Sequence, residues 1–203
     1  MIIGICGFQS SGKDTIAELL INEYGYKKLS FAGALKDVVS IIFGWSRDKL
    51  EGLTKEDRIW REQIDPWWSN TLKMPQLTPR YVLQYFGTDL FRNHWHRDIW
   101  VKVVENQLVR LHNENIVITD CRFENEINLI MSYGGKMIHV YRDLPEWFHR
   151  YKLGIPVEEV KQLHRSEVEW INCYCDYEIA NKGTVDELYE KVNNLLVKQL
   201  KEL

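Results

Sequence analysis

The sequence predicts an α/β fold in which five parallel strands form one sheet with helices on both faces. Three observations lead to this prediction. Short apolar runs alternate with amphipathic segments, a glycine-rich turn joins the first run to a helical pattern, and no internal repeat interrupts the order. Strands that alternate with helices are typical of parallel sheets, because each parallel connection must cross back over the sheet.

Each expected strand is a short apolar run bounded by turn or polar residues, and the runs cover residues 2–6, 26–31, 115–120, 136–141 and 177–180. Helical patterns follow at residues 16–25 and 34–43. A last helix begins at Thr184, because Glu187 completes a capping box with that threonine. The apolar positions of this helix are Val185, Leu188, Val192, Leu195 and Leu196.

The turn after the first strand has the composition of a phosphate-binding loop, Gly7-Phe8-Gln9-Ser10-Ser11-Gly12-Lys13-Asp14-Thr15. Backbone N–H groups of such a loop converge on phosphate oxygens, the helix N-terminus adds a favourable dipole, and the lysine supplies a positive charge. The motif predicts a three-layer P-loop NTPase fold that binds a nucleoside triphosphate. The expected contacts are Gly7, Gln9, Ser10, Ser11, Gly12, Lys13, Asp14 and Thr15.

Two carboxylates are candidates for a magnesium site. Asp14 stands where such loops usually carry a metal-binding serine or threonine, so it either faces the metal or merely favours the first helical turn. Asp120 ends the third expected strand, where a metal-supporting carboxylate belongs, or else it caps the next helix. Arg122 would lie at the same sheet edge, where open α/β sheets bind ligands, or would form a surface pair with Glu126.

Two stretches interrupt the alternation of strands and helices. Residues 44–100 are rich in tryptophan and contain a helix that Thr78 caps, with Pro79 at its first position and an expected end near Gly87. Residues 142–175 are basic and aromatic. Because insertions after sheet strands often bind substrates or close over them, the sequence predicts one domain over all 203 residues, with an acceptor-binding insertion and then a lid.

Arginines in both insertions are candidate phosphate ligands. Arg80 and Arg92 have the fork geometry to hold a phosphate bidentately, whereas the nearby tryptophans, taken singly, are better explained as core residues. In the second insertion, Arg142 and Arg165 are expected to stabilise charge on a transferring phosphoryl group. The remaining cations there fit a solvated helix face.

The turn at Asn181 and Gly183, between the last strand and the last helix, is a candidate contact for the base of the triphosphate. The simpler interpretation is a helix N-cap turn. Four cysteines, Cys6, Cys121, Cys173 and Cys175, lack a zinc spacing and are expected to be reduced.

The bulk composition excludes several classes of partner. A net charge of −3 gives no indication of nucleic acid or an anionic membrane. No apolar run approaches the ~20 residues that span a bilayer, and the N-terminus lacks a signal-peptide layout. We therefore expect a cytoplasmic protein, in the host cytoplasm if the source is a virus.

Together these residues resemble the phage-type deoxynucleoside monophosphate kinases, a branch of the P-loop nucleoside monophosphate kinases. The resemblance covers most of the chain and depends on the order and spacing of its motifs. They are the loop at 7–15, Phe31-Ala32-x-Ala34-Leu35-Lys36, Gly87-Thr88 with Arg92 and Trp100, Asp120-x-Arg122-Phe123-x-Asn125-Glu126, His164-x-Ser166-Glu167, and Asn181-x-Gly183-Thr184.

The resemblance implies ATP as phosphoryl donor, Mg²⁺, and a deoxynucleoside 5′-monophosphate as acceptor, with ADP and a diphosphate as products. It implies that Lys13, Arg142 and Arg165 are catalytic and that Asp14 and Asp120 support the metal. It further implies an acceptor site formed by Lys36, Arg80, Gly87, Thr88, Arg92, Trp100, Asp120, Arg122 and Glu126.

Two other functions remain open at this point. A kinase of dephospho-coenzyme A or of another phosphorylated metabolite would use the same chemistry, although the long aromatic insertion favours an acceptor with a base. A non-catalytic ATP-binding module, or an ATPase domain of a larger complex, is disfavoured by the lid arginines. The sequence leaves the accepted bases and the oligomeric state open, with a homodimer as one candidate.

Overall fold

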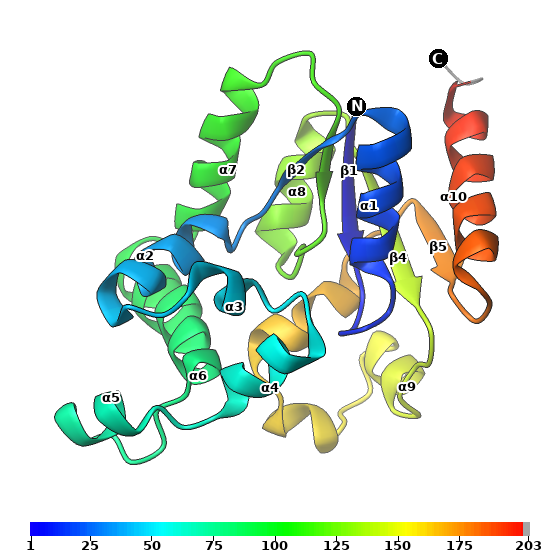
Figure 1. Ribbon diagram of the computed structural model, residues 1–203. Helices are drawn as coiled ribbons and strands as arrows, with labels where there is room; N and C mark the ends of the chain where they lie inside the picture. The colour runs from blue at the N-terminus through cyan, green and yellow to red at the C-terminus, as the bar shows by residue number, and fades with distance from the viewer. Residues whose placement is uncertain (201–203) are drawn as a thin grey trace. The chain divides into compact units, whose positions relative to one another are not determined.

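The structure, a computed structural model, describes residues 1–200. Its chain forms two compact units. The first contains Met1–Ser30 and the chain from Gln107 onward, and the second is Phe31–Asn106. Figure 1 shows the elements of both.

The first unit contains one sheet of five parallel strands in the order β2-β3-β1-β4-β5 (Figure 1). The predicted five-stranded parallel sheet is therefore confirmed. Strands β4 and β5 have the expected bounds, whereas β2 and β3 are shorter than expected. The strands are β1 (Ile2–Cys6), β2 (Lys27–Leu29), β3 (Ile116–Ile118), β4 (Lys136–Tyr141) and β5 (Tyr177–Ala180).

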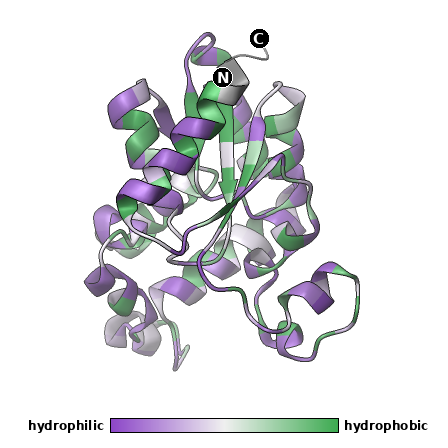
Figure 2. Cartoon of the chain, turned by 90° about the vertical axis from the view of Figure 1, so that its right-hand side faces the viewer, coloured by the Kyte–Doolittle hydropathy of each residue, from purple (hydrophilic) through white to green (hydrophobic). Residues whose placement is uncertain are grey.

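Helices cover both faces of this sheet and give the three layers. On one face, α1 (Lys13–Tyr24) and α10 (Val185–Leu200) bury apolar residues against the strands. On the other face lies α8 (Glu124–Ser132), whose Ile130 side chain packs at Gly4 of β1. Figure 2 shows hydrophobic residues concentrated in the strands and polar residues on the outer helical surfaces.

The last helix confirms the predicted capping box. The Thr184 N–H donates to the Glu187 carboxylate, and the Glu187 N–H donates to the Thr184 hydroxyl, both at 3.2 Å. Leu188, Val192 and Leu196 are buried in the core as expected. Val185 differs, because its side chain in the first helical turn is 53% exposed.

The second unit is helical and has its own core, formed mainly by leucine, valine and aromatic side chains. Its elements are α2 (Gly33–Phe43), α3 (Arg47–Glu51), α4 (Lys55–Glu62), α5 (Pro66–Thr71), α6 (Pro79–Gln84), a π-helix (Tyr85–Trp95) and α7 (Ile99–Arg110), whose last turn belongs to the first unit.

The expected helix end near Gly87 was wrong. Thr78 caps α6 as predicted, but the chain continues past Gly87 as a π-helix to Trp95. A glycine ends a helix by adopting a left-handed conformation, and Gly87 is not among the residues with positive φ. It packs closely instead, because a Cβ there would lie 2.8 Å from Leu35 Cδ2 and the Leu35 side chain would have to shift.

Residues 142–175 of the first unit contain α9 (Phe148–Lys152) and three short 3₁₀ turns. All four thiols are free, and those of Cys6 and Cys121 are buried. Among the residues that the structure describes, no helix has both the length and the apolar character to cross a bilayer.

Candidate active site

The phosphate-binding loop leaves β1 at the carboxyl edge of the sheet, and two glycines allow its path. Gly7 has φ +146°, and a Cβ there would lie 2.2 Å from the Val140 carbonyl oxygen of β4. Gly12 has φ +109° and caps α1. Both positions therefore require glycine, because a side chain would be strained and would clash.

Lys13, the first residue of α1, extends back along the loop. Its ammonium donates hydrogen bonds to the Gly7 carbonyl at 2.9 Å and to the Phe8 carbonyl at 2.6 Å. Burial, with a smaller contribution from the Arg122 charge, lowers the pKa of Lys13 to about 8. The free enzyme at pH 7 therefore holds a desolvated cation inside the loop, where an incoming phosphate would stabilise it.

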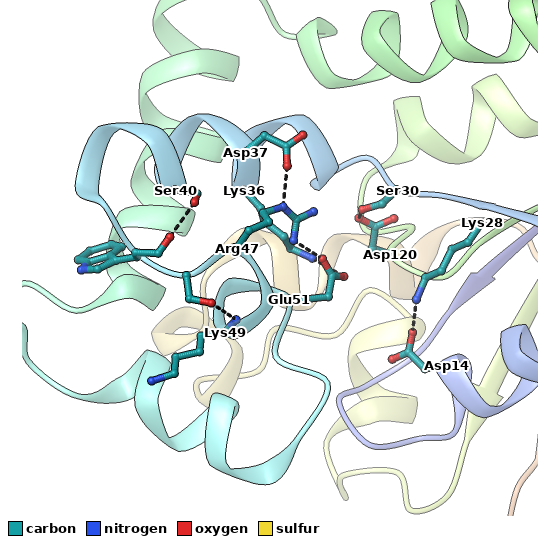
Figure 3. A network of polar contacts seen from close by, with 12 residues as sticks. Asp14, Lys28, Ser30, Lys36, Asp37, Ser40, Arg47, Lys49, Glu51 and Asp120 are labelled. Atoms are coloured by element: carbon teal, nitrogen blue, oxygen red, sulfur yellow. Dashed lines mark hydrogen bonds and ion pairs between the residues drawn. The ribbon is translucent and has the colours of Figure 1, made fainter.

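Asp14 is fixed by two neighbours at the same sheet edge. Its Oδ1 accepts a hydrogen bond from the Thr119 hydroxyl at 3.0 Å. The same oxygen accepts a hydrogen bond from the Lys28 ammonium, also at 3.0 Å (Figure 3). Partial burial opposes ionisation of Asp14, but Lys28 and Thr119 outweigh it and hold the pKa of the carboxyl below its usual value. Asp14 is therefore an anion at neutral pH.

Asp120 follows β3 and accepts a 2.7 Å hydrogen bond from the Ser30 hydroxyl after β2 (Figure 3). Across the described residues, no three His, Cys, Asp or Glu side chains gather as a metal site. Mg²⁺ keeps several waters and takes one or two carboxylates together with phosphate oxygens. Two carboxylates on this edge thus fit a metal that arrives with the nucleotide.

Arg122 connects the sheet edge to the segment 142–175. Its Nη1 lies 3.2 Å from the Glu167 carboxylate. The charges of both residues affect the Lys13 pKa in opposite directions, so all three side chains share one electrostatic environment. The alternative interpretation, a surface pair between Arg122 and Glu126, does not hold, because Glu126 is buried at 2% exposure.

Glu126 has a structural role at the start of α8. Its carboxylate accepts the backbone N–H groups of Arg122 at 2.7 Å and Phe123 at 3.1 Å, and the residue is only 2% exposed. This carboxylate caps the helix that follows the site. Its contact with an acceptor remains a prediction.

The two arginines expected to be catalytic have different surroundings. Arg142, directly after β4, is exposed and has no hydrogen bond or ion pair within the described part of the chain. Arg165 is paired with Glu169 and lies over the Phe123 ring at 5.7 Å. Arg142 is therefore available for an anionic ligand, whereas Arg165 must first break its ion pair with Glu169.

Phe8 is a residue of this site that the sequence reasoning missed. Its ring makes edge-on contacts with Trp147, Phe148 and Trp170, at centroid distances of 5.9, 5.9 and 5.1 Å. These three rings belong to the segment 142–175. The phosphate loop is thus packed directly against that segment, and the only sequence signal for this is the aromatic residue at the second loop position.

Replacing Phe8 with alanine is expected to lower the free energy of unfolding by about 2 kcal/mol, because it leaves a cavity among three rings. Chemical unfolding followed by tryptophan fluorescence measures this change. Phe8→Leu keeps most of the apolar volume and serves as the control, with an expected loss of less than about 1.5 kcal/mol. Equal stability of Phe8→Ala and the wild type would contradict this packing role.

In the second unit, Lys36 lies in the first turn of α2 and is 9% exposed. Its ammonium donates to the Glu51 carboxylate at 2.8 Å, and Arg47 joins Glu51 to Asp37 with two contacts of 2.6 Å (Figure 3). Partial burial opposes ionisation of Glu51, but the two cations lower its pKa to about 2. Sequence reasoning missed Glu51, because α2 and α3 are brought together only by folding.

The π-helix contains two further predicted residues, Thr88 and Arg92, and both side chains are buried. Gly87 accepts a 2.9 Å hydrogen bond from the indole of Trp100, which is 5% exposed. Trp100 therefore supports the π-helix from the core. Arg80 lies 3.3 Å from Glu62. A contact of any of these residues with a nucleotide remains a prediction.

Comparisons with known proteins identify the family of this chain. The family model for deoxynucleotide monophosphate kinases matches residues 62–192. A relative from Acanthamoeba polyphaga mimivirus is 30% identical over 95% of this chain and 94% of its own. The deoxynucleotide monophosphate kinase of Enterobacteria phage T4 is 23% identical over 96% and 98%.

Among solved structures, shikimate kinase from Aquifex aeolicus aligns over 98% of each chain, with 16% identity and a TM-score of 0.49. The chain belongs to the deoxynucleotide monophosphate kinase family.

Proposed function

We propose that this protein transfers the γ-phosphoryl group of ATP to a deoxynucleoside monophosphate and forms ADP and a deoxynucleoside diphosphate. The observation that carries the proposal is the phosphate loop with Lys13 inside it, in a chain whose family is that of deoxynucleotide monophosphate kinases. Phosphoryl transfer depends on positioning and charge neutralisation. The loop and the cations around it supply both.

The acceptor phosphate needs no general base. Its second pKa is near 6, by analogy with phosphorylated side chains, so it is a dianion at pH 7. Lys13 and Arg142 would neutralise charge that develops on the transferring group, and Arg165 would join them on release from Glu169. Mg²⁺, held by the phosphates with Asp14 and Asp120, would neutralise further phosphate charge when bound.

We further propose that residues 44–100 bind the acceptor and that residues 142–175 form a lid. A buried cation supports the first assignment, since Arg92 is 9% exposed. The packing of Phe8 against aromatic rings of 142–175 supports the second. A lid also has a chemical purpose, because excluding water prevents hydrolysis of ATP.

An acceptor panel tests the proposed function. We expect ADP release from ATP to be stimulated by one or more deoxynucleoside monophosphates, measured beside the ribonucleotides, dephospho-coenzyme A and a no-acceptor control. Turnover with dephospho-coenzyme A alone would contradict the proposal. ATP binding without stimulation by any small acceptor would also contradict it and would favour a non-catalytic module. Size-exclusion chromatography of the same sample distinguishes a monomer from a homodimer.

The Lys13 pKa predicts how the donor reaction depends on pH. Because the pKa of Lys13 in the free enzyme is about 8, this charge is present below that pH and is lost above it. We expect kcat/KM for ATP to fall above pH 8 by about tenfold per unit at saturating acceptor. The bound triphosphate raises the pKa of Lys13, so kcat falls only at higher pH. A kcat/KM that stays constant to pH 9.5 would contradict this assignment.

A further inference from the structure

The phosphate loop accepts a hydrogen bond from Asn181, a residue 170 positions away from Ser11 in the chain. Asn181 follows β5, and its backbone N–H donates to the Tyr141 carbonyl at 2.7 Å, which extends the β4–β5 pairing by one step. Its side chain is turned inward and is 3% exposed. From there Nδ2 donates a 2.9 Å hydrogen bond to the Ser11 carbonyl of the loop.

The side-chain amide of Asn181 occupies the space beside Gly12, which has no side chain. A Cβ on Gly12 would lie 2.4 Å from Asn181 Nδ2. The glycine is therefore needed both for its φ of +109° and for the space that the asparagine occupies. Gly12 and Asn181 fit each other as a pair.

This contact fixes the orientation of one peptide group in the loop. In a planar trans peptide, the carbonyl and the N–H point in opposite directions. Because the Ser11 carbonyl is directed at Asn181, the N–H of Gly12 points away from Asn181. Phosphate-binding loops depend on such N–H groups being directed at the ligand before it arrives.

We propose that Asn181 is a positioning residue of the phosphate loop and does not read the adenine base. The inference rests on the proposed use of ATP as donor. Its buried amide already donates to the loop backbone, and an almost fully enclosed side chain offers no surface to a base. The sequence alone predicts a base contact or an N-cap turn here, whereas the geometry points to a third role.

ATP and inorganic tripolyphosphate test this role, because both carry three phosphates and only ATP carries a base. Dissociation constants for ATP and for inorganic tripolyphosphate are measured by calorimetry, both with Mg²⁺ and without acceptor. Asn181→Ala removes the donor, and Asn181→Asp replaces it with an oxygen that repels the Ser11 carbonyl. We expect both variants to bind both ligands more weakly by the same factor, about tenfold, the size of effect that loss of a buried hydrogen bond gives.

Val192→Ala is the matched control. This residue of α10 is buried at 1% exposure in the core of the first unit and is not part of the phosphate loop. It loses stability through a cavity, and we expect its dissociation constants to be unchanged.

Three results would overturn the inference. Weaker binding of ATP with unchanged binding of tripolyphosphate would show that Asn181 reads the base. Unchanged binding of both ligands by the Asn181 variants would exclude a positioning role. Equal weakening in Val192→Ala would assign the effect to general destabilisation. None of these measurements involves phosphoryl transfer, so failure of the proposed function is seen separately in the acceptor panel.

Discussion

Replacing Lys13 with methionine is expected to lower kcat by about 10³-fold, because the side chain keeps its length but loses the charge that stabilises the transferring group. The structure places the ammonium inside the loop, bonded to the Gly7 and Phe8 carbonyls. ADP release with a saturating deoxynucleoside monophosphate measures kcat. The ATP dissociation constant, measured in parallel, separates lost binding from lost chemistry.

Lys161→Met is the control for this variant. Lys161 is 67% exposed and forms a surface pair with Glu158 at 2.6 Å, and such pairs contribute little to stability. We expect it to retain wild-type turnover. If Lys13→Met turned over within about threefold of the wild type, the loop would not be the donor site, and the proposed function would lose its main support.

The parts of the fold that the sequence predicted well are those determined by local patterns. Strands β4 and β5 are apolar runs bounded by turns, and both have the predicted bounds. The capping box of Thr184 and Glu187 depends on residues three apart, so it is visible in the sequence. The phosphate loop is likewise contiguous, and each part of its signal lies within a few residues.

The parts that were missed depend on contacts between distant segments. Asn181 meets Ser11 only after β5 takes its place beside β4. Phe8 meets Trp170 only after the segment 142–175 packs on the loop. The glycine signal at Gly87 is local and predicts a helix end, whereas in the structure the chain continues as a π-helix and Gly87 packs against Leu35. Sequence patterns carry no direct information on such pairings.

The surroundings of Arg142 and Arg165 rank these two candidate catalytic arginines. Replacing Arg142 with alanine is expected to lower kcat by about 10³-fold, the size of effect known for arginines that neutralise a transferring phosphoryl group. Arg142 is exposed after β4 and has no partner among the described residues. Arg165→Ala is expected to cost less, about tenfold, because Arg165 is already paired with Glu169 and loses that pair when it binds a phosphate.

Arg150→Ala provides the control for a surface arginine of the same segment, since Arg150 is 56% exposed and lies 3.9 Å from Glu159. Its turnover is expected to match the wild type. Arg142 can bind a phosphate without breaking an ion pair, whereas Arg165 must first break its pair with Glu169. The expected ranking of the two losses in kcat follows from this difference. If Arg165→Ala loses more turnover than Arg142→Ala, the pair with Glu169 must open during catalysis, and Arg165 is the main catalytic arginine.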